Sequence, residues 1–591
     1  MEQYIVYTVI TFILLSLYFN WLGASFTFVL GVLTLGFAGI LSPKEILSGF
    51  ANEQIIIIIV LLLIGDIIRS KGILNNFFEK FVFRGARTYH RFLGRMMFMV
   101  AGSSAFLNNT PLVAVMMPYV NKWSGKNDMA SSKFLIPLSF AAILGGTITL
   151  IGTSTNLIVN GMLQDQKIIP NFHSLDIFDF AWVGIPMSIL GLTYLMIFSK
   201  KLLPSNKDIS KNLESNLREY LVEVKITSKS DLIGKTVSKA GLRNLKSLYL
   251  VEVEREGYVY SATSPNFLLR QDDILSFAGD TAALAEIIDP SNGMQIEHAA
   301  EHQAEKKTGL LEVVVAANSV LVNKTVKQSN FRSKYDASVI AVHRNGEKLK
   351  GKIGNIIIKA GDVLLMLTGE DFESRSFRDR EFYRISKLRT YEKPKVLDTI
   401  VLIGGLIAAI MLSAFKIIPL FIGVLGLLAI VLILGIANPK EIEKGIDFNL
   451  GLTISMALAL GTAMTNTGVA ADISHGIINL LAPLGILGLL AGVYIATSIL
   501  AAYITNVASV AILFPIVLSI AAEESLNPLP FVLLIAYAAA ANFMTPIGYQ
   551  TNMMVYGPGS YKFTDYLKIG LPLTVLYGVG AVLILWWRFF V

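Results

Sequence analysis

Two short polar stretches interrupt segments that are otherwise apolar enough to lie in a membrane. The first is "LNNT" at Leu107–Thr110, within residues 96–121, which carry no charge; the second is "YITN" at Tyr503–Asn506. Asn109 and Asn506 are 397 positions apart, and a proline follows nine residues after each. Polar groups buried unpaired in lipid are costly. Amide oxygens, hydroxyls and free carbonyls suit a hard cation such as Na⁺, and helix N-termini offer N–H groups to an anion.

The uncharged residues 96–121 are bordered on both sides by basic residues, which is awkward for a single crossing. This pattern favours a re-entrant hairpin that enters and leaves on the cytoplasmic side, with the asparagines at its tip. Non-helical backbone at membrane depth is tolerated only where protein or a water-filled cavity covers it. We therefore predict one hairpin near residues 96–121 and a second near residues 483–520, each with a polar tip.

A second pair of motifs is related by a similar offset. "GTSTNLIVNG" at Gly152–Gly161 and "GYQTNMMVYG" at Gly548–Gly557 are 396 positions apart, and in both, glycine and small polar residues break an apolar run. Hydroxyl and amide groups can coordinate a cation and donate to an oxyanion without a buried charge. Helix packing is the ordinary explanation for one such motif. Four motifs in two symmetric pairs favour a binding site.

The composition indicates a polytopic α-helical membrane protein. Of 591 residues, 53% are hydrophobic and 16% charged, and the mean hydropathy is +0.59. Uncharged apolar runs recur, and since one crossing needs roughly 20 residues, we expect about ten crossings. The first run lacks a basic segment and a cleavage site, so we expect retained spans. The net charge of +7 fits cytoplasmic loops and calls for no nucleic-acid partner. The absence of cysteine excludes disulfides and thiolate metal sites.

Charged residues are concentrated in a central insert, which divides the chain into four parts. We predict a first membrane repeat at 1–200, two small domains with linkers at 201–300 and 301–395, and a second membrane repeat at 396–591. By the positive-inside rule, basic borders place the insert and the loop near residues 80–95 in the cytoplasm, and the N-terminus outside. The basic residues are Lys200, Lys201, Lys207, Lys211, Arg384, Lys387, Arg389, Lys393 and Lys395 for the insert, and Lys80, Arg84, Arg87, Arg91 and Arg95 for the loop.

The membrane parts repeat each other with opposite orientation. "SPKEILSGF" at Ser42–Phe50 matches "NPKEIEKGI" at Asn438–Ile446, and Pro43 and Pro439 are again 396 positions apart. An odd number of crossings, five, is expected between them. Inverted repeats with broken helices are a signature of secondary transporters, whose substrate sites lie near the midplane.

The insert is itself a repeat of two α+β modules. Lys235 pairs with Lys324 and Asp273 with Asp362, each pair 89 positions apart. Short β-rich runs alternate with one helical stretch in each module.

With these motifs in place, the membrane parts resemble the divalent anion–sodium symporter family, which includes dicarboxylate, citrate and sulfate carriers. That family has Ser-Asn-Thr signatures at two hairpin tips and Gly-Thr-Pro-Pro-Asn-like signatures in two unwound helices. The resemblance covers almost all of residues 1–200 and 396–591. It implies a homodimer in the cell (inner) membrane, with a scaffold and an elevator-type transport domain in each subunit.

The resemblance also assigns roles to the polar residues, with a cation half-site at each tip and the substrate between the tips. The implied Na⁺-binding residues are Ser104, Asn108, Asn109, Gly152, Asn156, Thr505, Asn506, Gly548 and Asn552. The implied substrate-binding residues are Asn109, Thr110, Thr153, Ser154, Thr155, Asn506, Val507, Gln550 and Thr551.

Two departures from the family signatures bear on the substrate. The second tip has Val507 where a threonine is implicated in carboxylate recognition, and the Pro-Pro pairs are replaced by Ser-Thr and Gln-Thr. These variants, with a soluble insert, resemble the branch of bacterial and algal sulfate carriers. Sulfate is therefore the first expectation and a dicarboxylate the alternative. Coupling to H⁺, and exchange, remain alternatives to Na⁺ symport.

The insert resembles two tandem C-terminal subdomains of RCK (regulator of K⁺ conductance) domains, also called TrkA-C. This resemblance implies dimerisation and a small regulatory ligand; a passive dimerisation module is the competing interpretation. The Rossmann subdomain that usually precedes them is not expected, because the insert has no Gly-x-Gly-x-x-Gly after a strand.

Two other classes of protein were weighed against a transporter of anions. An RCK-like insert would suit a K⁺ channel or transporter, but the sequence has no Thr-Val-Gly-Tyr-Gly filter. A membrane enzyme is disfavoured because there is no His-Glu-x-x-His motif and the six histidines lie away from the polar tips. We expect no enzymatic activity and no metal other than Na⁺.

Overall fold

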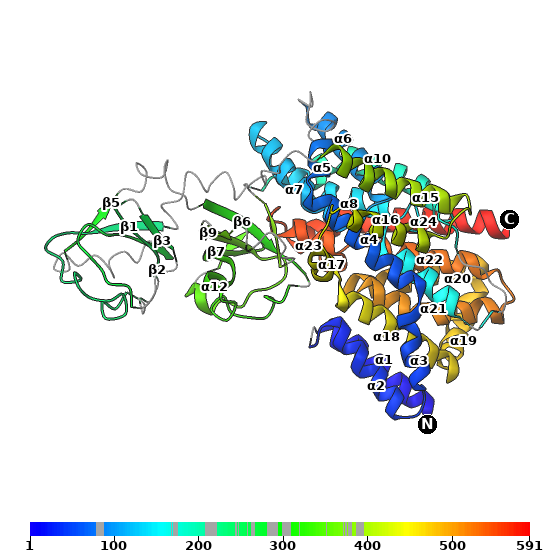
Figure 1. Ribbon diagram of the computed structural model, residues 1–591. Coiled ribbons are helices and arrows are strands. Elements are labelled where there is room, and N and C mark those ends of the chain that lie inside the picture. Colours follow the sequence, from blue (N-terminus) through cyan, green and yellow to red (C-terminus); the bar gives the residue numbers. More distant parts are fainter. Residues whose placement is uncertain are drawn as a thin grey trace.

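The computed structural model describes residues 1–19, 21–78, 88–166, 168–169, 175–206, 221–242, 245, 248–256, 258–261, 266–279, 293–297, 309–317, 319–349, 351–369, 371–372, 375, 381–385 and 395–591. Several basic residues used to orient the chain lie outside these ranges: Lys80, Arg84, Arg87, Lys207, Lys211, Lys387, Arg389 and Lys393. The helices of the two membrane parts form one body, and the two sheets of the insert lie beside it (Figure 1).

The two membrane parts contain helices in the same order. The first comprises α1 (Glu2–Tyr18), α2 (Ala24–Phe37), α3 (Pro43–Ser48), α4 (Glu53–Ser70), α5 (Ile73–Phe78), α6 (Tyr89–Ser104), α7 (Asn109–Lys126), α8 (Leu135–Gly146), α9 (Ser154–Asp165) and α10 (Ala181–Leu202). The second comprises α14 (Val396–Thr399), α15 (Gly405–Ala414), α16 (Leu420–Ile433), α17 (Pro439–Gly445), α18 (Phe448–Asn466), α19 (Val469–Leu481), α20 (Gly485–Tyr503), α21 (Asn506–Glu523), α22 (Pro528–Ala540), α23 (Gln550–Tyr556) and α24 (Phe563–Phe590).

The repeated motif around Pro43 and Pro439 starts a short helix in each part. Both prolines occupy the first turn, where the missing N–H costs nothing. Glu45 accepts a hydrogen bond from the Ser42 N–H at 2.9 Å, and Glu441 accepts one from the Asn438 N–H at 3.2 Å. The same capping device therefore begins α3 and α17.

Many helices are apolar enough to lie in a membrane. Within the described residues, six are long and apolar enough to cross, or seven if the bent pair Pro43–Ala51 and Glu53–Ser70 counts as one span. Five shorter apolar helices accompany them, and two of these, Ser131–Gly146 and Pro528–Ala540, end at polar motifs. The long helices alone therefore do not account for all the expected crossings, and the shorter helices must supply the rest.

Helices α8 and α22 lie at the centre. Every residue of α8 is buried, as is nearly every residue of α22, because both helices are apolar on all sides. Their neighbours correspond: α8 packs against α6, α7, α10 and α23, whereas α22 packs against α20, α21, α24 and α9. Each central helix therefore contacts the broken helix of the other membrane part.

The insert contains two antiparallel sheets with one topology. The first has strands β1 (Leu221–Ile226), β2 (Leu248–Arg255), β3 (Tyr258–Ser261), β4 (Ile274–Gly279) and β5 (Met294–Glu297), in the order β3-β2-β4-β1-β5. The second has β6 (Gly309–Val315), β7 (Ala337–Arg344), β8 (Glu347–Lys348), β9 (Val363–Thr368) and β10 (Phe382–Arg384), in the order β10-β6-β9-β7-β8, with helix α12 (Phe331–Tyr335) beside it.

Paired ion contacts and bulges repeat between these sheets. Arg255 and Asp273 form a two-pronged ion pair at 2.7 and 2.8 Å, and Arg344 and Asp362 form the same pair at the same distances. Strands β2 and β7 also carry a bulge at corresponding positions. The corresponding residues of the two ion pairs are 89 positions apart, which is the offset seen in the sequence.

The second sheet, but not the first, packs closely on the membrane helices, as Figure 1 shows. The Asn121 side chain of α7 donates to the Ile385 carbonyl at 3.3 Å. A Cβ at Gly557, just after α23, would overlap the Gly361 carbonyl and lie 2.9 Å from Val363. The second sheet therefore contacts two of the helices that begin at polar motifs, α7 and α23.

Candidate functional site

Four irregular segments meet near the centre of the helical body. We call Asn108–Thr110 tip 1 and Thr505–Val507 tip 2, since they lie where α6 turns into α7 and α20 into α21. Residues 147–153, between α8 and α9, are break 1; residues 541–549, between α22 and α23, are break 2.

Tip 1 is held by its own polar side chains. Asn108 caps α7 by accepting the Thr110 N–H at 3.1 Å, an arrangement that satisfies a free helix donor. Asn109 is buried, and the Ser104 hydroxyl lies within hydrogen-bond distance of both Asn109 Oδ1 and the Ala142 carbonyl, the latter at 2.7 Å, so these two acceptors share its one proton. Because Oδ1 faces Ser104, the Asn109 amide nitrogen points to the opposite side.

Breaks 1 and 2 are closed by the same hydrogen bonds. In break 1, Asn156 Nδ2 donates to the carbonyls of Gly146 at 3.4 Å and Thr149 at 2.9 Å. In break 2, Asn552 Nδ2 donates to the carbonyls of Asn542 at 2.9 Å and Thr545 at 3.1 Å. All three residue pairs differ by 396, so one device forms both turns.

Each break is also tied to its hairpin. The Thr149 hydroxyl donates to the Ala105 carbonyl, and the Thr545 hydroxyl donates to the Ala502 carbonyl at 2.8 Å. The backbone passes so close here that only glycine fits. A Cβ at Gly152 would lie 2.5 Å from the Gly146 carbonyl, and one at Gly548 would lie 2.7 Å from the Ala501 carbonyl.

The first half-site is joined to break 2 by two side-chain bonds. Asn109 Nδ2 donates to the Tyr549 hydroxyl at 2.6 Å, and that hydroxyl lies 3.1 Å from the Thr153 hydroxyl. The Thr110 hydroxyl donates to Gln550 Oε1 at 3.1 Å. Tip 1, break 1 and the start of α23 therefore meet at one place.

Tip 2 is arranged differently. Thr505 caps α21 by accepting the Ala508 N–H at 3.2 Å. The side-chain oxygen of Asn506 is buried without a hydrogen-bond partner among the described residues, and so are those of Asn156 and Asn542. Buried polar atoms are normally paired. Three unpaired carbonyl-type oxygens therefore lie at the two breaks and at tip 2.

Some residues expected at the site have other partners. The Ser139 hydroxyl of α8 donates to Asn552 Oδ1 at 2.7 Å and lies 2.8 Å from Thr551 Oγ1, so both side chains of α23 face α8. Thr155 is buried within α9. Val507, Ser154 and Gln550 are partly exposed at the segments where they were expected.

The structure adds three residues to the site: Tyr549, Asn542 and Ser139. The sequence held a signal for the first two, because they lie 396 positions after Thr153 and Gly146, which are part of break 1 or border it. Ser139 gave no such signal, since it stands in an apolar helix and its counterpart is Ile535.

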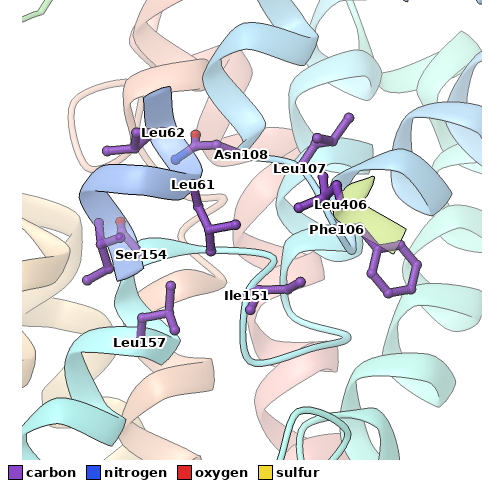
Figure 2. A pocket seen from close by; sticks show the side chains of 10 residues that line it. Leu61, Leu62, Phe106, Leu107, Asn108, Ile151, Ser154, Leu157 and Leu406 are labelled. Atoms are coloured by element: carbon purple, nitrogen blue, oxygen red, sulfur yellow. The ribbon is translucent and has the colours of Figure 1, made fainter. Parts of the chain in front are cut away.

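A small recess, partly open to the surroundings, lies beside tip 1 (Figure 2). Asn108 and Ser154 are the polar side chains on its wall, and helix α4 supplies an apolar side. The remaining lining residues are Ile58, Leu61, Leu62, Phe106, Leu107, Ile151, Leu157 and Leu406. Within the described ranges, no group of three His, Cys, Asp or Glu side chains could hold a metal ion.

Helices broken at polar turns, in two matching sets within an apolar body, define a multi-pass membrane transporter. A family model described as "Citrate transporter" matches residues 11–413 and 406–591. The chain therefore belongs to the citrate transporter family, which is related to the divalent anion–sodium symporters, and it is a transporter and not an enzyme.

Similar proteins from two organisms match nearly the whole chain. A protein of Chlamydomonas reinhardtii named "Putative sulfur deprivation response regulator" is 34% identical over 90% of this chain and 93% of its own length. A Synechocystis protein named as an uncharacterized transporter is 32% identical over 98% and 95%. Sodium/sulfate cotransporter 1 of Chlamydomonas reinhardtii is 24% identical over 99% and 89%.

Proposed function

We propose that this protein is a secondary active symporter that couples Na⁺ to a small divalent oxyanion, with sulfate as the first choice. The observation that carries the proposal is the pair of polar breaks closed by identical hydrogen bonds, each next to a hairpin tip. The names of the algal relatives, which are sodium/sulfate cotransporters, support sodium and sulfate.

The cation is assigned to the unpaired oxygens. Oδ1 of Asn506, Asn542 and Asn156 are amide carbonyl oxygens, which are hard ligands that bind Na⁺ without adding a second buried charge. Ser104, Asn108, Asn109, Gly152, Thr505, Gly548 and Asn552 complete the proposed cation-binding set through side-chain or backbone oxygens. Asn156 and Asn552 contribute in addition by closing the breaks.

The anion is assigned to the donors between the tips. Thr110, Thr153, Ser154 and Gln550 offer hydroxyl or amide hydrogens, and the N-termini of α7, α9 and α21 start at the tips and at break 1. An anion held only by neutral donors remains costly to desolvate. Na⁺ bound beside it lowers that cost, and the anion does the same for Na⁺. We therefore expect the two to bind together.

The transport cycle is proposed to follow an elevator mechanism in a homodimer. The two membrane parts would be inverted repeats, with the tips and breaks carried in a moving domain across the cell membrane and the insert in the cytoplasm. The correspondence of neighbours around α8 and α22 supports this arrangement, since each central helix packs against the broken helix of the opposite part.

The test of transport is uptake into proteoliposomes. Labelled sulfate and labelled succinate are supplied with an inward Na⁺ gradient, and again with the gradient replaced by choline. The proposal predicts sulfate uptake that requires Na⁺ and exceeds succinate uptake. Flux of K⁺ without uptake of either anion would refute it.

Dicarboxylate transport is the second candidate, and one observation favours it. Tip 1 retains the threonine, Thr110, that belongs to the carboxylate-type signature, and its hydroxyl faces Gln550 at the proposed substrate position. Uptake of succinate in preference to sulfate, in the same assay, would select this candidate.

We propose that the insert regulates transport through the second sheet. That sheet touches α7 at Asn121 and the end of α23 at Gly557, so a ligand or dimer contact on the insert could change the freedom of two site-bearing helices. Gly557→Ala should separate the sheet from α23 and change the transport rate, because the added methyl overlaps the Gly361 carbonyl.

Gly354→Ala is the matched control, since its nearest neighbour would lie 3.8 Å away. Deletion of residues 212–384 should likewise change the rate or dimer stability and leave the order of substrates unchanged. A changed substrate order after either alteration would contradict a purely regulatory insert.

A further inference from the structure

Tyr549 lies where the two half-sites meet. Its hydroxyl is 2.6 Å from Asn109 Nδ2 and 3.1 Å from Thr153 Oγ1, so it contacts both tip 1 and break 1 although it belongs to break 2. Tyr549 and Thr153 are separated by 396 positions, the repeat offset. Tyr549 and Thr153 thus occupy corresponding positions in the two repeats and contact each other across the boundary between them. The tyrosine is far larger than the threonine.

The opposite junction shows no such bonds in the described ranges. The residues that correspond to Asn109 and Thr110 are Asn506 and Val507. Asn506 Oδ1 has no hydrogen-bond partner within the described part of the chain, and valine has no hydroxyl to offer. Tip 1 is therefore joined to Tyr549 of break 2 and to Gln550 of α23 by two side-chain bonds, whereas no corresponding bond joins tip 2 to Thr153 or to α9 among the described residues.

The bond directions leave a hydroxyl proton for an anion. Asn109 Nδ2 can only donate, so the Tyr549 oxygen accepts from it, and Thr153 Oγ1, at 3.1 Å, is in position to take the phenol proton. Thr153 then has its hydroxyl proton to give to a neighbouring oxyanion. Hydrogen bonds in such a chain polarise one another, which strengthens the last donor.

The phenol ring also fills space. An oxygen atom that contacts Asn109 and Thr153 together is already provided by Tyr549, so an anion has to bind beside the phenol and not in its place. A compact tetrahedral anion needs only the remaining donors. A dicarboxylate also needs room for the second carboxylate at the other end of its carbon chain.

We propose that Tyr549 is a positioning residue that orients Thr153 toward the anion and, through its ring, restricts the site to small oxyanions. This inference rests on the proposed function, because it assumes that an anion is carried between the tips. Under this inference, one side chain limits the size of the substrate, and that side chain belongs neither to the tip motifs nor to the family signatures.

Two variants separate the hydroxyl from the ring. Tyr549→Phe keeps the ring and removes the hydroxyl, and it should raise the apparent KM for sulfate about tenfold while the apparent affinity for Na⁺ changes less than about twofold. Tyr549→Thr reproduces the residue at the corresponding position and removes the ring. It should raise the ratio of succinate to sulfate uptake at least about tenfold.

Tyr194→Phe is the matched control. Its hydroxyl donates to the Ile569 carbonyl at 3.1 Å, between α10 and α24 and away from the tips, so its loss should leave sulfate KM and substrate order unchanged. Protein yield and the unfolding temperature, with and without sodium sulfate, show whether each variant is folded.

The outcomes distinguish this inference from the proposed function. Wild-type protein that carries neither anion would overturn the function and, with it, the role of Tyr549. Normal wild-type sulfate uptake, with an unchanged sulfate KM in Tyr549→Phe, would overturn the positioning role alone. Folded Tyr549→Thr that still excludes succinate would overturn the size restriction.

Discussion

The two half-sites of this transporter are alike in their backbone turns and unlike in their tips. Asn156 and Asn552 close breaks 1 and 2 with the same bonds at the same offset. At the tips, by contrast, Asn109 is fully engaged with Ser104 and Tyr549, whereas Asn506 keeps an unpaired oxygen. The shared features shape the site, and we infer that the differing features decide what each side binds.

A second difference lies behind the breaks. Ser139 of α8 donates to Asn552 Oδ1 at 2.7 Å, but the corresponding position in α22 is the apolar Ile535. Asn156 Oδ1 accordingly has no partner in the described part of the chain. The first break thus has a free side-chain oxygen where the second has a satisfied one, so we propose that the Asn156 side chain binds the cation, whereas the Asn552 side chain supports the fold and only its backbone oxygen is left for the cation.

The largest effects are expected from the tip asparagines. Asn109→Ala and Asn506→Ala should each abolish Na⁺-coupled sulfate uptake, the first by removing the bonds to Ser104 and Tyr549 and the second by removing a cation oxygen. Uptake and expression are measured together. Asn466→Ala is the control, because Asn466 is exposed and its amide donates to the Glu45 carboxylate at 3.1 Å, away from the tips. Near-normal uptake by a well-expressed tip variant would refute the site.

Glycine substitutions test the part that the half-sites share. Gly152→Ala and Gly548→Ala should both destabilise the protein, by about 1–3 kcal/mol or more, because the added methyl has no room against the Gly146 or Ala501 carbonyl. The unfolding temperature reports the change. Gly102→Ala in α6 meets no atom within 4 Å and should be neutral. A strong loss of stability in only one of the two variants, Gly152→Ala or Gly548→Ala, would show that the two breaks are not equivalent.

The hydrogen bond from Ser139 to Asn552, next to break 2, should affect the stability of the protein and not its choice of anion. Ser139→Ala leaves the buried Asn552 Oδ1 without a donor, so we expect a loss of about 1–3 kcal/mol in the free energy of unfolding. Ile535→Val, the matched change in the other half, removes one carbon and should cost about 0.5–1.5 kcal/mol. Equal stability of wild type and Ser139→Ala would show that this bond is not needed.

The smallest effect is expected from making the tips alike. Val507→Thr gives tip 2 the hydroxyl that tip 1 has at Thr110, and Val507 is partly exposed, so the change should fold normally. Succinate uptake should rise a few-fold relative to sulfate, as measured by competition with labelled sulfate. An unchanged ratio would mean that the valine does not influence the choice of anion.

The sequence predicted the locations of the polar segments because two independent patterns agreed: polar residues in apolar runs, and recurrence at a fixed offset. The hydrogen bonds of Asn156 and Asn552 could have been expected to match each other, since their surroundings repeat. The bond between Asn109 and Tyr549 could not, because it joins residues 440 positions apart and depends on how the two repeats pack.

The role of Ser139 could not be predicted from the sequence either. A single serine in an apolar helix reads as a packing residue, and only the tertiary contact with α23 gives its hydroxyl a partner. The insert was more predictable, because its Arg–Asp pairs and strand order follow local patterns that recur 89 positions apart. Its contact with α7 and α23 depends on tertiary packing and had no signature in the sequence.

The most direct test of the account is a pair of experimental density maps, one of protein in sodium sulfate and one in choline chloride. The account predicts density for a compact anion beside Thr153 and Tyr549, with a cation against the side-chain oxygens of Asn506 and Asn542, in the first map only. Both features should appear together. Tips and breaks that are identical in the two maps, or an anion bound only away from them, would contradict it.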